Sequence, residues 1–125
     1  MSTELLKVKD LKQHFPLHGG ILFREIGRVF AVDGVSVSVK KGETLGLVGE
    51  SGCGKTTLGR SMIRLYRPTA GEIIFDGLDI TRLRQKELRG LRREMQMIFQ
   101  DPFESLTSRH TVGEILEEPF LIHKI

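Results

Sequence analysis

The run of residues 49–56 constrains this chain more than any other part of its sequence. It reads Gly49-Glu50-Ser51-Gly52-Cys53-Gly54-Lys55-Thr56. The pattern G-x-x-x-x-G-K-[ST] is that of a P-loop, which joins a strand to a helix and wraps backbone N–H groups around phosphate oxygens. The sequence therefore predicts a site for the phosphates of a nucleoside triphosphate. The alternative interpretation is a glycine-rich turn that contains a lysine by chance.

Each fixed position of this P-loop has its own physical task. The glycines at 49, 52 and 54 permit positive φ values and let phosphate approach the backbone without a Cβ in the way. Lys55 supplies a mobile charge for the β- and γ-phosphates, and the Thr56 hydroxyl is placed to ligate Mg²⁺. The helix that begins here adds the partial positive charge of its N-terminus. We interpret Cys53 as a small residue without a redox role.

The segments on either side of the P-loop have the character that the motif requires. Residues 44–48 form a short, nearly continuous apolar run, which is typical of a strand buried on both faces of a parallel sheet. After the loop, Leu58, Met62 and Leu65 follow helical spacing as far as Pro68. Further strands are predicted at residues 5–11, 35–39, 72–75 and 97–99. Alternating strands and helices predict an α/β fold.

The last part of the chain shows helical patterns. Apolar residues between Ile80 and Met95 lie close to helical spacing, which Gly90 breaks. Thr111-Val112-Gly113-Glu114 has the form of a capping box, in which the threonine and glutamate side chains each bond a free backbone N–H. We expect a helix from this point, with an apolar stripe that Pro119 interrupts.

Composition and charge narrow the class of protein. The 125 residues, of which 39% are hydrophobic, suit one globular domain. No segment reaches the roughly 20 apolar residues needed to cross a bilayer, the start lacks the features of a signal peptide, and a single cysteine cannot form an internal disulfide. We therefore expect a cytosolic location. The net charge is only +3, and the basic cluster of residues 82–93 is interpreted as a solvated helix face or as a contact for phosphate backbones or acidic headgroups.

Three stretches together resemble the nucleotide-binding subunits of ATP-binding-cassette (ABC) transporters, specifically of the bacterial and archaeal importers of dipeptides and oligopeptides. They are AVDGVS at 31–36, GETLGLVGESGCGKTT at 42–57 and MQMIFQDP at 95–102. The resemblance covers nearly the whole chain and implies an α/β P-loop NTPase fold with an amino-terminal antiparallel β subdomain. It also implies that residues 1–125 are the amino-terminal part of such a domain, with the Q-loop at Gln100 and the start of a helical subdomain at about 103–125.

The resemblance assigns roles to individual residues. It implies that Gln100 reaches Mg²⁺ and the attacking water, so Lys55 and Gln100 are the expected catalytic residues and Thr56 and Gln100 the expected metal ligands. It implies that Phe15 stacks on adenine, although packing at the end of a strand is an alternative for this ring. The expected ATP-binding residues are Phe15, Gly49, Glu50, Ser51, Gly52, Cys53, Gly54, Lys55, Thr56 and Thr57.

The sequence also departs from the family pattern. Residues 16–28 match an insertion typical of the peptide importers, but Thr107-Ser108 replaces the usual Asn-Pro. The signature motif, the strand ending in Asp-Glu and the switch histidine of the family do not occur; Asp76, His110 and His123 do not fit these roles. We therefore expect a chain that corresponds to the amino-terminal part of a longer subunit and that binds ATP with negligible turnover.

Partners and location follow from the resemblance alone. It implies a second ABC ATPase subunit, integral membrane permease subunits and a cytoplasmic position on the inner face of the cell membrane. Peptide is the expected cargo, although nickel and glutathione systems have similar ATPases. The alternatives are a nucleic-acid maintenance ATPase and an inactive nucleotide-binding remnant. Nucleic acid is not expected as a partner, because no aromatic residues alternate with the arginines of residues 82–93.

Overall fold

The computed structural model describes residues 3–22, 24–50, 52–103 and 105–125. It divides into two compact units, Met1–Leu83 and Arg84–Ile125. The elements of the first unit are β1 (Glu4–Gly19), β2 (Arg24–Lys40), α1 (Lys55–Met62), β3 (Ala70–Phe75) and β4 (Leu78–Asp79). The second unit contains α2 (Gln85–Leu91) and α3 (Val112–His123).

The first unit is built on a four-stranded sheet with the order β2-β1-β3-β4, in which all neighbours are antiparallel. This sheet confirms the strands predicted at 5–11, 35–39 and 72–75. Val8 pairs with Val37 on one side and with Ile73 on the other. The buried apolar side chains of this unit come from all three long strands, from α1 and from the segment after β4: Val8, Leu11, Val32, Leu58, Ile73, Phe75 and Ile80.

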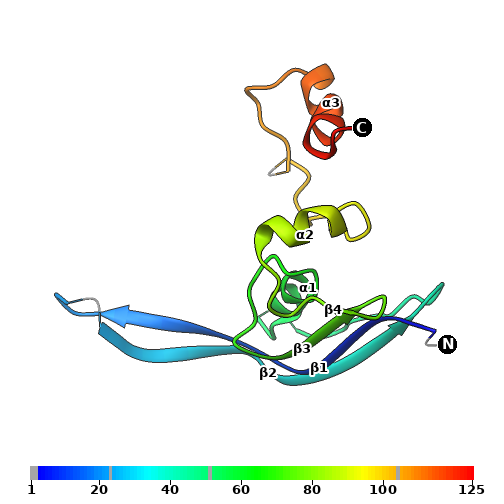
Figure 1. The fold of residues 1–125 in the computed structure, drawn as a ribbon. Coiled ribbons are helices and arrows are strands. Elements are labelled where there is room, and N and C mark those ends of the chain that lie inside the picture. The colour runs from blue at the N-terminus through cyan, green and yellow to red at the C-terminus, as the bar shows by residue number, and fades with distance from the viewer. Residues whose placement is uncertain (1–2, 23, 51, 104) are drawn as a thin grey trace. The chain divides into compact units, whose positions relative to one another are not determined.

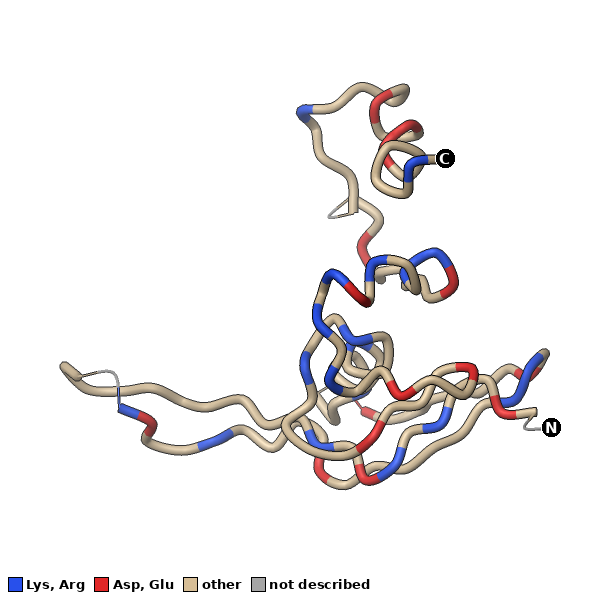
Figure 2. Tube along the Cα trace, viewed as in Figure 1, with Lys and Arg blue, Asp and Glu red and all other residues tan. Residues whose placement is uncertain are grey.

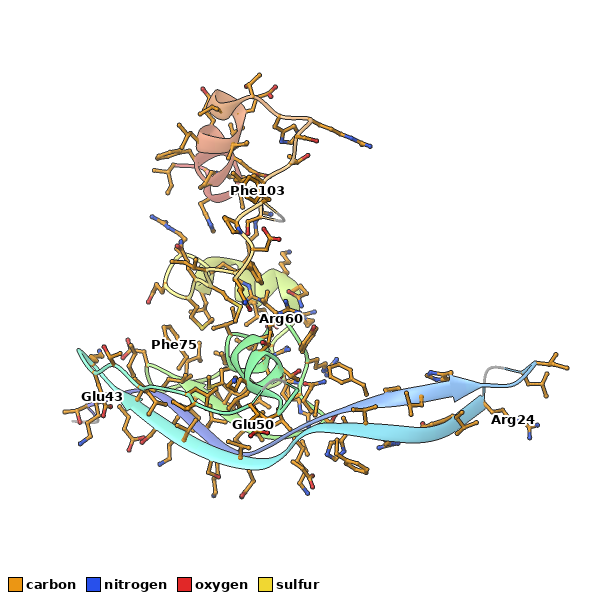
Figure 3. All side chains as sticks on the ribbon, turned by 180° about the vertical axis from the view of Figure 1, so that it is seen from behind. Arg24, Glu43, Glu50, Arg60, Phe75 and Phe103 are labelled. Carbon is orange, nitrogen blue, oxygen red and sulfur yellow. The ribbon has the colours of Figure 1, made fainter. Side chains whose placement is uncertain are left out.

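β1 and β2 continue beyond β3 as a long two-stranded hairpin. They have 16 and 17 residues, and their pairing extends to Gly19 opposite Arg24. Figure 1 shows this hairpin reaching far from α1, and Figure 3 labels Arg24 near its end. The described residues of the stretch 16–28, which the resemblance identified as an insertion, lie in this outer part.

α1 packs on the sheet through a small buried polar contact as well as through Leu58. Ser61 is fully buried, and its hydroxyl donates to the side-chain oxygen of Gln13 on β1 at 3.3 Å. The helix ends at Met62, earlier than the predicted end near Pro68. Arg64 follows with a φ of 58°, and its guanidinium donates to the carbonyls of Ile80 and Leu83 at 3.0 and 2.8 Å. These bonds tie the segment after α1 to the segment after β4.

The second unit contains the predicted capping box at the start of α3. The Thr111 hydroxyl accepts a bond from the Glu114 N–H at 3.3 Å, and the Glu114 carboxylate accepts one from the Thr111 N–H at 2.7 Å. The helix continues through Pro119 as far as His123, and none of its residues is buried. None of the helices in the described part of the chain has the length and apolar character needed to cross a bilayer.

The basic cluster of residues 82–93 lies around α2, where Figure 2 shows basic and acidic residues mixed. Arg84 pairs with Glu87 at 3.3 Å within the helix. Arg89 donates to the carbonyl of Ile122 at 2.9 Å. Partial burial lowers the pKa of Arg92, because a charged guanidinium is less stable away from water than in it. Some arginines of the cluster therefore interact within the second unit and do not face only water.

Two predicted strands are wrong: neither residues 44–48 nor residues 97–99 form a strand. Leu47 is 48% exposed and Ile98 is 98% exposed. A strand is held by hydrogen bonds to its neighbours, and every ladder among the described residues is antiparallel and involves β1 to β4. Both runs have the apolar composition of a buried parallel strand. Neither run has a strand to pair with among the described residues.

Candidate phosphate-binding site

The P-loop leads directly into α1, whose first residue is Lys55. The N-cap is Gly54, with a φ of 91°; glycine has no side chain, so it provides no side-chain bond to the helix end. The first N–H groups of a helix have no partner within it, and an anion is stabilised at this position. Within the loop, the Cys53 N–H donates to the Glu50 carbonyl at 3.3 Å. The local structure is thus a glycine-capped helix start that is open to a phosphate.

The three glycines of the P-loop have different surroundings. Gly52 has a φ of 81° with open space where a Cβ would lie, so only its backbone conformation favours glycine. At Gly54 a Cβ would lie 2.2 Å from the Ala31 carbonyl oxygen. At Gly49, whose φ is not in the left-handed region, a Cβ would lie 2.6 Å from the Cys53 sulfur, which can move. From the sequence, the space beside these glycines was expected to accommodate phosphate. At Gly54, the backbone of β2 instead occupies the space where a Cβ would lie.

Lys55 is folded back over the P-loop. Its ammonium group donates to the carbonyl oxygen of Gly49 and lies 3.5 Å from that of Glu50. Lys55 is half-buried, Thr56 is exposed and Thr57 is half-buried. The Thr57 carbonyl accepts a bond from the Ser61 hydroxyl at 2.8 Å. The lysine charge therefore lies inside the loop, next to the start of α1.

A cavity of about 280 Å³ lies between the P-loop and β2. Its lining comes from β2, from the run before the loop and from the loop and α1: Ala31, Val32, Asp33, Val35, Leu47, Val48, Cys53, Gly54, Lys55 and Leu58. The Asp33 carboxylate is hydrogen-bonded to the His14 ring at 3.0 Å. Sequence reasoning gave no site role to Ala31–Asp33. The signal was present, because these residues belong to the stretch 31–36 that carries the family resemblance.

Phe15 lies on the side of β1 that faces α1. It follows Gln13 by two residues, so the two side chains share one face of the strand, and Gln13 contacts Ser61 of α1. The Phe15 ring meets the Tyr66 ring edge to face, with centroids 5.5 Å apart and an interplanar angle of 83°. The structure thus brings Phe15 to the same side of the sheet as α1, but Phe15 is not among the described residues that line the cavity.

Two other predicted site residues, Ser51 and Gln100, and Asp76, for which no site role was expected, have different positions. Ser51 lies outside the described residues. Gln100 belongs to the second unit, in an exposed irregular segment, and its expected role at Mg²⁺ stays a prediction. Asp76 lies in the turn between β3 and β4, where its carboxylate pairs with Lys41 at 2.8 Å.

Comparison with protein families and relatives gives a consistent result. The ABC transporter family model matches residues 32–123. The chain is 55% identical to the oligopeptide transport ATP-binding protein AppF of Bacillus subtilis, over 97% of this chain and 37% of that protein. It is 52% identical to the oligopeptide transport ATP-binding protein OppF of the same organism, over 100% of this chain and 39% of that protein. The chain therefore spans well under half the length of these relatives.

Solved structures show the same likeness. MJ0796, described as a bacterial ABC transporter cassette in a dimeric structure, matches with a TM-score of 0.73 and 25% identity, over 93% of this chain and 47% of that one. The protein cbiO1 from Clostridium perfringens, part of the ABC transporter complex cbiONQ, matches with a TM-score of 0.66 and 28% identity, over 86% of this chain and 38% of that one. With a family model that matches most of its length, this chain belongs to the ABC transporter family.

Proposed function

We propose that this chain binds ATP through its P-loop and is part of an ATP-binding subunit of a peptide importer. The observation that carries the proposal is the start of α1, where a glycine N-cap without a side-chain bond lies beside the Lys55 ammonium group. Helix N-terminus and lysine together favour a polyphosphate. Membership of the ABC family, which implies nucleotide binding, supports ATP as the ligand.

The loop residues then have distinct roles in ATP binding. Lys55 exchanges its bonds to the carbonyls of Gly49 and Glu50 for bonds to β- and γ-phosphate oxygens. The Thr56 hydroxyl is exposed at the start of α1 and is the kind of hard oxygen ligand that Mg²⁺ prefers. When bound, the ion would neutralise charge on the phosphates. Thr57 and the backbone of Gly49–Gly54 complete the proposed phosphate contacts.

Two further residues have proposed roles away from the loop. Phe15 offers a ring for stacking on adenine, on the α1 side of β1. Gln100 is proposed to reach Mg²⁺ and the attacking water, so that Lys55 and Gln100 act in catalysis. The resemblance supports this role of Gln100, and an assay of ATP hydrolysis in the complete subunit tests it.

The complete protein is proposed to energise transport by binding and hydrolysing ATP. Its proposed partners are a second ABC ATPase subunit and integral membrane permease subunits, at the cytoplasmic face of the cell membrane. The names of AppF and OppF, both oligopeptide transport ATP-binding proteins, support peptide as the cargo rather than nickel or glutathione. Copurification of the complete subunit with permease subunits tests this part of the proposal.

Calorimetric titration with Mg·ATP tests the phosphate site directly. Lys55→Ala removes a charge-assisted contact, so we expect the affinity to fall by about tenfold or more. Lys86→Ala is the matched control, because it removes the same charge from an exposed position in α2. An equal loss in the two variants, or no ATP binding by the unaltered chain, would contradict the proposal.

A further inference from the structure

Tyr66 connects two parts of the first unit that the proposed function assigns to ATP. Its ring contacts the Phe15 ring of β1 edge to face at 5.5 Å between centroids. Its hydroxyl accepts a hydrogen bond from the Arg60 guanidinium at 3.0 Å. Arg60 lies in the last turn of α1, and Figure 3 labels it on that helix. One side chain thus bridges β1 and α1.

The edge-to-face geometry is suited to holding a ring without covering it. The two rings are inclined at 83°, so the contact with Tyr66 covers at most one face of Phe15. Phe15 and Tyr66 are both half-buried, and a ring in that position needs a neighbour to fix its tilt. Tyr66 is itself held by Arg60, which donates to its hydroxyl and whose guanidinium carbon lies over the ring at 6.0 Å from its centroid.

The same helix also carries the phosphate end of the proposed site. Lys55 is the first residue of α1 and Arg60 lies in its last turn, about 7.5 Å further along the axis. Part of the spacing between the phosphate contacts and the base contact is therefore set by α1, and the segment after the helix, which carries Tyr66, sets the rest. Tyr66 is the residue that transmits this spacing to Phe15.

We propose that Tyr66 is a positioning residue for the adenine base, which holds the Phe15 ring at a fixed tilt relative to α1. Arg60 supports this role by fixing the Tyr66 ring. The inference rests on the proposed function, because it requires that ATP binds at the P-loop with its base against Phe15. It adds a residue after α1 to a base site that sequence reasoning placed on Phe15 alone.

Titration with two ligands separates the base contact from the phosphate contact. We expect Tyr66→Ala to weaken ATP binding by about three- to tenfold, the range for an aromatic pair, and to leave the affinity for inorganic tripolyphosphate unchanged. Tyr66→Phe keeps the ring and loses the bond from Arg60, so its effect on ATP should be smaller. Leu65→Ala, at an exposed neighbouring position, is the control and should change neither affinity.

A double-mutant cycle tests whether Tyr66 acts through Phe15. If it does, Tyr66→Ala has no further effect on ATP affinity once Phe15→Ala is present. Equal losses for ATP and tripolyphosphate, or additive losses in the cycle, would overturn the inference and leave the proposed function intact. If the unaltered chain binds neither ligand, the proposed function itself fails.

Discussion

The antiparallel sheet of the first unit and residues 44–48 both contain apolar residues, but only the sheet consists of paired strands. Val8 of β1 is hydrogen-bonded within ladders on both sides and is buried. Leu47 lies in an irregular segment and is 48% exposed. The difference shows that an apolar run becomes a strand here only where the described chain also supplies a partner for its backbone.

The P-loop keeps its form although the run before it is not a strand. Its fixed points are the start of α1, the Lys55 bonds to loop carbonyls, and the close approach of Gly54 to Ala31. Ala31 belongs to β2, so one of these fixed points joins the loop directly to the sheet. The phosphate site is therefore expected to depend on the sheet more than on the apolar run beside it.

Truncation of a core residue in each region gives the largest expected difference in stability. Ile73→Ala opens a cavity at a fully buried position of β3 and should lower the free energy of unfolding by about 2–5 kcal/mol. Leu47→Ala should cost well under half of that, because the side chain is already half in water. Urea denaturation followed by circular dichroism measures both. Ile73→Val, with an expected loss of about 0.5–1.5 kcal/mol, covers the case in which the alanine variant does not fold.

A comparison of two glycines separates the sheet from the loop. Gly71 and Gly54 have φ values of 95° and 91°, and at each a Cβ would lie within 2.5 Å of a backbone oxygen. Gly71→Ala and Gly54→Ala should each lower stability by at least the roughly 1–2 kcal/mol of a left-handed conformation. Only Gly54→Ala should also reduce ATP affinity, measured by calorimetry at a temperature where both variants are folded.

Gly52→Ala is the control for this comparison. Its φ of 81° carries the same conformational cost, but no atom lies within 4 Å of the added Cβ. The stability loss should therefore be smaller than at Gly54. Equal ATP affinity in the Gly54 and Gly71 variants would contradict the view that the approach of β2 shapes the loop.

The smallest expected effect concerns α3, which buries no residue and depends on local bonds. Thr111→Ala removes the hydroxyl of the capping box and should cost about 1 kcal/mol of helix stability. Loss of helical signal in circular dichroism measures it. Ser108→Ala, in the exposed segment before the helix, is the control. No change in the Thr111 variant would show that packing, rather than capping, maintains this helix.

Much of the fold was predictable wherever the signal is local. Alternation at Val35-Ser36-Val37-Ser38-Val39 indicated a strand, and the structure has it within β2. The capping box at Thr111 was also correct, because cap and partner lie three residues apart. The strands at 44–48 and 97–99 were wrong, since pairing depends on distant residues that a local pattern does not specify.

In the candidate site, too, features set by local spacing were predictable and contacts between distant residues were not. Lys55 and the glycine N-cap follow from the motif, because spacing along the chain fixes them. The approach of Ala31 to Gly54 and the contact of Tyr66 with Phe15 join residues far apart in the sequence, which no spacing rule relates. The assignments of Phe15 and Gln100 came from family resemblance and stay predictions.

The bonds between the Lys55 ammonium group and the loop carbonyls have a thermodynamic consequence. A ligand at this loop does not meet a free cation but competes with acceptors that the protein already provides. A measured dissociation constant therefore reports an exchange of hydrogen-bond partners of Lys55. The free energy gained from each phosphate oxygen is partly offset by the loss of a bond to a loop carbonyl, which then bonds to water. We therefore expect this loop to favour ligands with several negatively charged oxygens over singly charged anions, because several phosphate oxygens can replace all the carbonyl contacts that Lys55 loses.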